Sequence, residues 1–157
     1  MTLLQIGNKI NEAIKDRMKV QGHHLRGGIE NSLRLEETGN EITCYAAHYA
    51  EFVNNGVPAA KIPYSPGSGK KKSDYISGLQ EYAKARKMAD TDEEALSIAF
   101  AIAKKHKKNG MPTGGSWGWS RNGKRTGFIS DVLKEMQPTI KADITQVFRV
   151  TIKDKLR

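Results

Sequence analysis

The 157-residue sequence predicts a single domain, residues 1–157, of the α+β class. We expect an N-terminal helix, a β-hairpin or small antiparallel sheet, a short helix, a basic helical insertion at about 57–127, and a C-terminal helix. Apolar residues recur every three or four positions over 2–20 and again after Pro138, which is the period of an amphipathic helix. Residues 32–46 instead alternate between apolar and polar side chains on both sides of a turn, which is typical of strands.

The N-terminal part is expected to form a helix, a hairpin and a short helix in that order. Gly22 follows the last apolar position of the first helix and suits a helix stop. Residues 38–40, Thr-Gly-Asn, supply the turn of a hairpin with one buried face, on which Cys44 is expected to be a small buried residue. A helix of about two turns should then cover 46–53 and end at Gly56.

The predicted insertion combines two helices with two flexible stretches. Residues 57–73 hold three of the five prolines and are expected to form a loop. Asp74 is expected to cap the first helix, and Thr91 with Glu94 gives a capping box before the second. The stretch 110–127 contains six glycines and both tryptophans, so we expect the tryptophans to pack against something.

The C-terminal element is expected to be a helix that begins after Pro138. Ile140, Ile144, Val147 and Phe148 lie at helical spacing there. The run VFRVTI is rich in β-branched residues and partly alternating, so a strand is the alternative interpretation. We favour the helix.

The positive charge is concentrated in one segment. The chain carries a formal net charge of +9, and residues 61–125 hold 14 basic and 6 acidic side chains, a net of +8. Such an excess indicates a polyanionic partner. No apolar run approaches the roughly 20 residues that would span a bilayer, and the N-terminus lacks a secretory pattern. We therefore expect neither membrane contact nor export, and the single cysteine indicates synthesis in a reducing cytoplasm.

Cationic side chains in this segment are the candidate contacts for nucleic acid or for an acidic protein partner. Cations near phosphates release counterions, so they could hold nucleic acid without reading its sequence. The alternative is a solvated helix face with a basic loop. The candidates are Lys70, Lys71, Lys72, Lys104, Lys105, Lys107, Lys108, Arg121, Lys124 and Arg125.

No residue pattern indicates catalysis or a metal site, so we expect no catalytic residues, no metal and no cofactor. The run SPGSGKKKS departs from the phosphate-binding motif GxxxxGK[ST], which needs glycine at Tyr64 and serine or threonine at Lys71. Cys44 and His48 lack a third metal ligand at a suitable spacing. Glu51 lacks a carboxylate partner for acid/base work.

Residues 27–56, GGIENSLRLEETGNEITCYAAHYAEFVNNG, resemble the core of the phage head-to-tail joining proteins called tail-completion, tail-terminator or neck proteins. That family shows an N-S-x-x pattern at its first strand, a second strand, and a helix of YAxxVExG type. The acidic residue usual near the end of that helix is Asn54 or Asn55 here. The matching residues are Asn31, Ser32, Tyr49, Ala50, Phe52, Val53 and Gly56.

The resemblance implies a non-enzymatic virion subunit that forms a homo-oligomeric ring at the head–tail junction, neck or tail end of a tailed bacteriophage. Its partners would be neighbouring portal, connector or tail proteins, with nonspecific contact to the genomic DNA that passes through. We hypothesise that Tyr49, Phe52 and Val53 build the core and part of the subunit interface. We further hypothesise that Trp117 and Trp119 anchor the insertion to a neighbouring ring. The alternative function is a sequence-nonspecific nucleic-acid-binding accessory protein.

Overall fold

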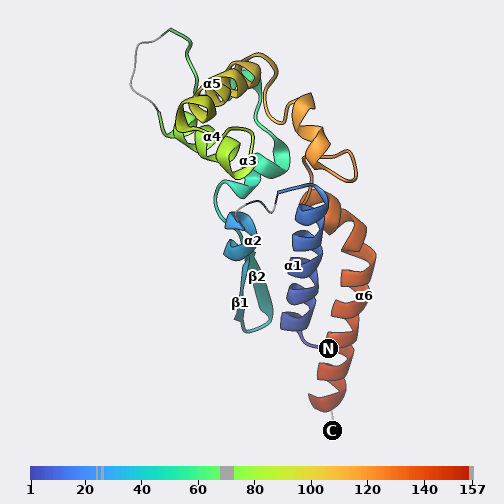
Figure 1. The fold of residues 1–157 in the computed structure, drawn as a ribbon. Coiled ribbons are helices and arrows are strands. Elements are labelled where there is room, and N and C mark those ends of the chain that lie inside the picture. Colours follow the sequence, from blue (N-terminus) through green and yellow to red (C-terminus); the bar gives the residue numbers. More distant parts are fainter. Residues whose placement is uncertain (24, 26, 68–72, 156–157) are drawn as a thin grey trace. The chain divides into compact units, whose positions relative to one another are not determined.

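The computed structural model describes residues 1–23, 25, 27–67 and 73–155, with side chains up to residue 149. Its helices and its two-stranded antiparallel sheet confirm the α+β class (Figure 1).

The chain divides into two compact units. The first unit joins Met1–Asn55 to Trp119–Arg157, and the second unit is Gly56–Gly118. The second unit therefore coincides with most of the segment that the sequence indicates as an insertion. Residues 119–127 of that segment belong to the first unit.

The first unit contains both predicted terminal helices and the predicted hairpin. Its elements are α1 (Leu3–Val20), α2 (Gly28–Ser32), β1 (Arg34–Thr38), β2 (Glu41–Tyr45), α3 (Ala50–Asn55) and α6 (Ser130–Lys155).

Local hydrogen bonds define both ends of α1. The Thr2 side chain accepts from the Gln5 backbone N–H, and the Gln5 side chain accepts from the Thr2 N–H, which forms a capping box. Gly22 follows the helix with φ of 72°, a left-handed conformation that favours glycine, as the sequence predicts.

The hairpin has a two-residue turn. Thr38 pairs with Glu41, so Gly39 and Asn40 form the turn, and Gly39 has φ of 60°. Glycine at the first turn position matches a type II′ hairpin. The face that carries Leu35 and Ile42 packs on α1.

Two predictions about burial in the hairpin region are wrong. Cys44 is exposed, although it lies opposite Leu35. Tyr49 and Phe52 do not lie in the core, because the six-residue helix α3 buries only Ala50. Val53 does pack against the core cluster.

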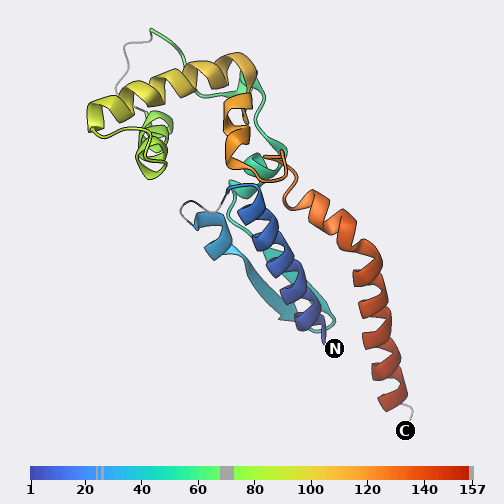
Figure 2. The same cartoon turned by 45° about the vertical axis from the view of Figure 1, so that its right-hand side comes forward.

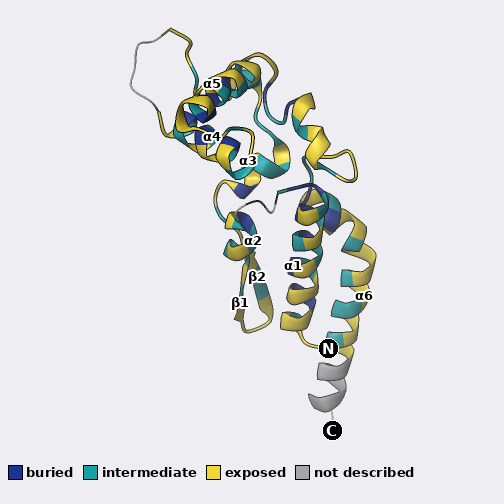
Figure 3. Cartoon of the chain, in the orientation of Figure 1, coloured by how far each residue is buried: buried dark blue, intermediate teal, exposed yellow. Residues whose placement is uncertain are grey.

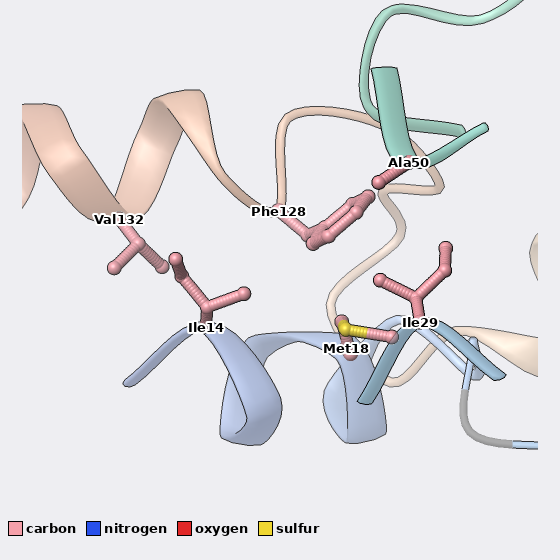
Figure 4. Packing of buried hydrophobic residues seen from close by; sticks show 6 residues of the cluster. All are labelled: Ile14, Met18, Ile29, Ala50, Phe128 and Val132. Atoms are coloured by element: carbon pink, nitrogen blue, oxygen red, sulfur yellow. The ribbon is translucent and has the colours of Figure 1, made fainter. Parts of the chain in front are cut away.

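The core of the first unit lies where α1, α2, α3 and the start of α6 meet (Figure 4). Phe128 and Met18 are fully buried at its centre. Because residues from all four helices pack in this one hydrophobic cluster, it holds α2 and α3 against α1 and α6. The buried members are Ile14, Met18, Ile29, Ala50, Phe128 and Val132.

Helix α6 begins eight residues before Pro138 and continues through it, so the predicted start is wrong while the predicted helix is confirmed. It runs antiparallel to α1 (Figures 1 and 2). Ion pairs join the two helices on both sides of Pro138: Arg17 with Glu135, and Lys9 with Asp143 at 2.9 Å.

The second unit is built on a helical pair, α4 (Asp74–Ala85) and α5 (Asp92–Asn109), with short 3₁₀ segments at Ala59–Lys61 and Gly114–Trp119. Ser73, not Asp74, caps α4, since its side chain accepts from the Ile76 N–H. Thr91 caps α5 as predicted. The small core contains Ile76, Ala99, Ala103, Tyr64, Tyr75, Leu79 and Leu96.

The capping box predicted at Thr91 is only half formed. The Thr91 side chain accepts from the Glu94 N–H, but the Glu94 carboxylate accepts from the N–H of Asp90 rather than from that of Thr91. The helix start is still fully defined by these two bonds.

A backbone bridge pairs two segments of the second unit. The Val57 N–H donates to the Met111 carbonyl at 2.9 Å, and the Met111 N–H donates to the Val57 carbonyl at 2.7 Å. This antiparallel bridge joins the start of the second unit to the segment that follows α5.

Candidate interaction surfaces

Exposed aromatic side chains lie at and before α3. Phe52 is 55% exposed and Tyr49 is 40% exposed. The Tyr49 ring makes an edge contact with His48, and its hydroxyl lies beside Gly28. The fold of the first unit leaves a large part of both rings exposed, so this part is available to a partner.

Polar side chains fix the position of α3. The Ser32 hydroxyl donates to the Ile29 carbonyl at 2.7 Å and accepts from the Ala47 N–H at 2.8 Å. Ser32 belongs to the N-S pattern in the sequence, and the structure gives it the role of joining α2 to the segment before α3. The sequence offers no pattern from which these partners could be predicted.

Asn54 joins the end of α3 to the start of α6. Its side-chain carbonyl oxygen accepts from the N–H groups of Ile129 at 2.8 Å and Ser130 at 3.3 Å. Its backbone carbonyl accepts from the Gly127 N–H at 2.7 Å. Asn54 therefore supplies the oxygen that the first turn of α6 needs.

Both tryptophans are exposed at the end of the 3₁₀ segment Gly114–Trp119. Trp117 is 56% exposed and Trp119 is 41% exposed. The fold therefore leaves much of each indole in contact with solvent.

Residues 119–127 cover the C-terminal end of α1. The Arg121 N–H donates to the Val20 carbonyl at 2.8 Å, and the Gln21 amide donates to the Thr126 carbonyl at 2.9 Å. The Arg125 guanidinium donates to the Gln21 carbonyl. Arg125 thus helps to hold this segment on α1 and is partly buried.

The predicted cations fall into three groups. Lys70, Lys71 and Lys72 lie outside the described residues. Others make contacts within their own unit: Lys107 donates to the Ile62 carbonyl at 3.2 Å, Lys124 pairs with Asp131 at 2.9 Å, and Arg125 bonds to Gln21. Lys104, Lys105, Lys108 and Arg121 are exposed and have no acidic partner within 4 Å among the described residues.

Three of the exposed lysines share one side of α5. Ala95, Ala99 and Ala103 form its buried stripe. At 100° per residue, Lys104, Lys105 and Lys108 all point more than about 90° away from the centre of that stripe. We call these three residues the basic face of α5.

His106 lies on the packed side of α5, next to α4. The Tyr75 hydroxyl and His106 Nδ1 are 2.7 Å apart. Burial raises the pKa of Tyr75 to about 12 and lowers the pKa of His106 below its ordinary 6.5. The pair is therefore neutral at pH 7 and adds no charge to the basic face.

The turn between β1 and β2 is coloured as exposed in Figure 3, and the glutamates beside it, Glu36, Glu37 and Glu41, are exposed. Glu36 lies 3.5 Å from Arg34, and its hydrogen bond raises the pKa of Tyr45. Glu37 and Glu41 have no ion pair among the described residues. We call the three glutamates the acidic turn.

The described residues contain no group of three or more His, Cys, Asp or Glu side chains that could hold a metal ion. None of the helices in the described part of the chain has both the length and the apolar composition to cross a membrane. Searches with the chain find no matching family model, no matching curated protein and no matching solved structure.

Proposed function

We propose that this protein is a structural subunit of a bacteriophage virion that forms a ring at the head–tail junction, neck or tail end, through which DNA passes. The observation that carries the proposal is the exposure of Tyr49 and Phe52. They lie in the segment that resembles the joining proteins, and the fold of their own unit leaves them uncovered. Exposed aromatic residues are typical anchors at the centre of protein interfaces.

The physical demands on such a ring fit this chain. A closed ring needs two different surfaces on each copy, because side-to-side contacts between copies are heterologous. DNA of any sequence must pass, so cations near the DNA suffice and base contacts are not needed. The proposed partners are further copies of the chain and neighbouring portal, connector or tail proteins.

Replacement of Phe52 by alanine tests the aromatic contact. Burying a phenylalanine is worth about 1.5–3 kcal/mol, so Phe52→Ala should weaken self-association by about tenfold or more. The circular dichroism spectrum and unfolding midpoint should stay unchanged because the side chain is exposed in the monomer. Sedimentation velocity over a range of protein concentrations measures the effect.

Met88→Ala is the control, because Met88 is also an exposed apolar residue but is not one of the exposed aromatic side chains at and before α3. A role for Phe52 would be contradicted if Phe52→Ala self-associated as strongly as Met88→Ala and the unchanged chain.

A sequence-nonspecific nucleic-acid-binding accessory protein is the second candidate, favoured by the exposed Lys104, Lys105, Lys108 and Arg121. Binding to several phosphates would make the affinity for DNA fall steeply with salt. A free ring subunit should show little DNA affinity at physiological salt. Fluorescence anisotropy with a labelled duplex of arbitrary sequence, measured at several salt concentrations, distinguishes the two functions.

A further inference from the structure

The basic face of α5 has positive charge that the described fold does not neutralise. Lys104, Lys105 and Lys108 are exposed, and none has an ion pair among the described residues. Lys108 lies in the last turn of α5, where a cation interacts favourably with the helix dipole, whereas Lys104 and Lys105 lie before that turn. The dipole does not account for a side-by-side set directed away from the core.

The acidic turn carries three negative charges, which equal in number the three positive charges on the basic face of α5. Glu36, Glu37 and Glu41 lie within six residues with no basic residue between them. The turn is open, because a Cβ added to Gly39 would meet no atom within 4 Å. The turn is therefore accessible to another molecule.

We propose that the basic face of α5 in one copy of this chain binds the acidic turn of a second copy. The inference rests on the proposed ring and names its charged contact. The two surfaces differ, so the contact is heterologous, and each copy offers one surface to each neighbour. Such a contact propagates from copy to copy until the ring closes.

A second copy explains more of the molecule than nucleic acid does. Phosphates would match the basic face of α5 but would be repelled by the acidic turn, which would be left without a role. A neighbouring copy matches both surfaces at once. Complementary charges of this kind also select the correct partner surface and speed its encounter.

The contact should be sensitive to salt. Single exposed ion pairs contribute little, so the three lysines and three glutamates act together through their summed field. Raising the ionic strength from about 0.1 M to about 1 M shortens the screening length from about 10 Å to about 3 Å. Self-association should therefore weaken markedly over this range.

Charge reversal on each surface tests the contact. The helix variant carries Lys104→Glu, Lys105→Glu and Lys108→Glu. The turn variant carries Glu37→Lys and Glu41→Lys, which leaves the Glu36–Arg34 pair intact. Each variant alone presents two surfaces of like charge and should associate with itself at least about tenfold more weakly than the unchanged chain.

Mixing the two variants in equal amounts should restore assembly, because each then offers the charge that the other needs. A single chain that carries both sets of substitutions should also assemble. A variant with Lys134→Glu, Lys141→Glu and Arg149→Glu is the matched control, since it reverses three exposed cations on α6. It should assemble like the unchanged chain. Mass photometry and sedimentation velocity follow assembly, and circular dichroism confirms that each variant is folded.

Lysine-to-glutamine changes at the same three α5 positions provide a second variant that does not oppose the helix dipole. They should weaken association less than the glutamate changes do, and failure of either folded helix variant to weaken it overturns the inference.

Failure of the mixture to assemble, or equal loss in the α6 control, overturns the charged contact while the ring proposal stands. If a variant with substitutions on the basic face of α5 still assembles but no longer binds DNA, then this face binds nucleic acid. That result overturns the proposed contact between copies. An unchanged chain that stays monomeric at low salt and high concentration overturns both the contact and the ring.

Discussion

Asn54 is the residue on which the junction between α3 and α6 depends. Its side chain accepts from two N–H groups at the start of α6, and its backbone accepts from Gly127. Asn54→Ala should lower the free energy of unfolding by about 1 kcal/mol, because two helix N–H groups lose their acceptor. Asn54→Asp should keep or raise stability, since a carboxylate is favourable at a helix N-terminus. Urea unfolding followed by circular dichroism measures both.

Asn55→Ala is the control for this prediction, because Asn55 is exposed and has no bond to α6 among the described contacts. Equal destabilisation by Asn54→Ala and Asn55→Ala would contradict the capping role.

Trp117 and Trp119 are the proposed anchors to a neighbouring ring. Both are exposed, so Trp117→Ala with Trp119→Ala should leave the monomer folded. If they anchor a neighbouring ring, the double variant should block particle assembly. Complementation of phage growth, with electron microscopy of the particles, measures the outcome. Normal particles from the double variant would remove this role.

At the scale of elements, the packed pair α4 and α5 should respond to pH. Below pH 6.5 the unfolded chain binds a proton at His106 more readily than the folded chain does, so stability should fall with acidification. Between pH 10 and about 12 the unfolded chain loses the Tyr75 proton before the folded chain does, so stability should fall there too. The contribution of this pair to stability should therefore be greatest between about pH 7 and 10.

Tyr75→Phe separates this effect from other titrations. Its free energy of unfolding should fall less than that of the unchanged chain between pH 10 and 12, because the titrating hydroxyl is gone. Tyr82→Phe, on the same helix, is the matched control. Denaturant unfolding at pH 5, 8 and 11 measures the difference, and identical alkaline losses in Tyr75→Phe and the unchanged chain would contradict it.

Periodicity predicts the elements well where local patterns are strong. The capping residue Thr2 and the apolar spacing define α1, and Gly39 defines the hairpin turn. Helix α6 differs, because Pro138 predicts a start that the structure does not show. Contacts with α1 on both sides of Pro138 maintain the helix across it, and such long-range packing leaves no local signal in the sequence.

The whole chain divides into two compact units, and the Val57–Met111 bridge lies within the second of them. Replacing residues 58–110 by Asn-Gly should leave the first unit folded, because a two-residue turn can connect an antiparallel pair. The segment 56–118 should also fold alone around its own small core. Circular dichroism and cooperative urea unfolding test both fragments, and non-cooperative unfolding of either would contradict its independence.

The candidate surfaces could be predicted only in part, because charge and aromaticity are visible in sequence while partners are not. Lys107, Lys124 and Arg125 look like the other cations, yet they bond to Ile62, Asp131 and Gln21. Two of these partners lie far away in the sequence, so no spacing rule predicts them. The exposure of Phe52 likewise depends on how short α3 is.

Native mass spectrometry of the full chain at low salt, over increasing protein concentration, tests whether this chain forms a ring. A ring-forming chain should give one closed assembly of fixed copy number, such as six or twelve, that appears together with the loss of monomer. A chain that remains monomeric at every concentration and binds DNA of any sequence tightly would contradict it.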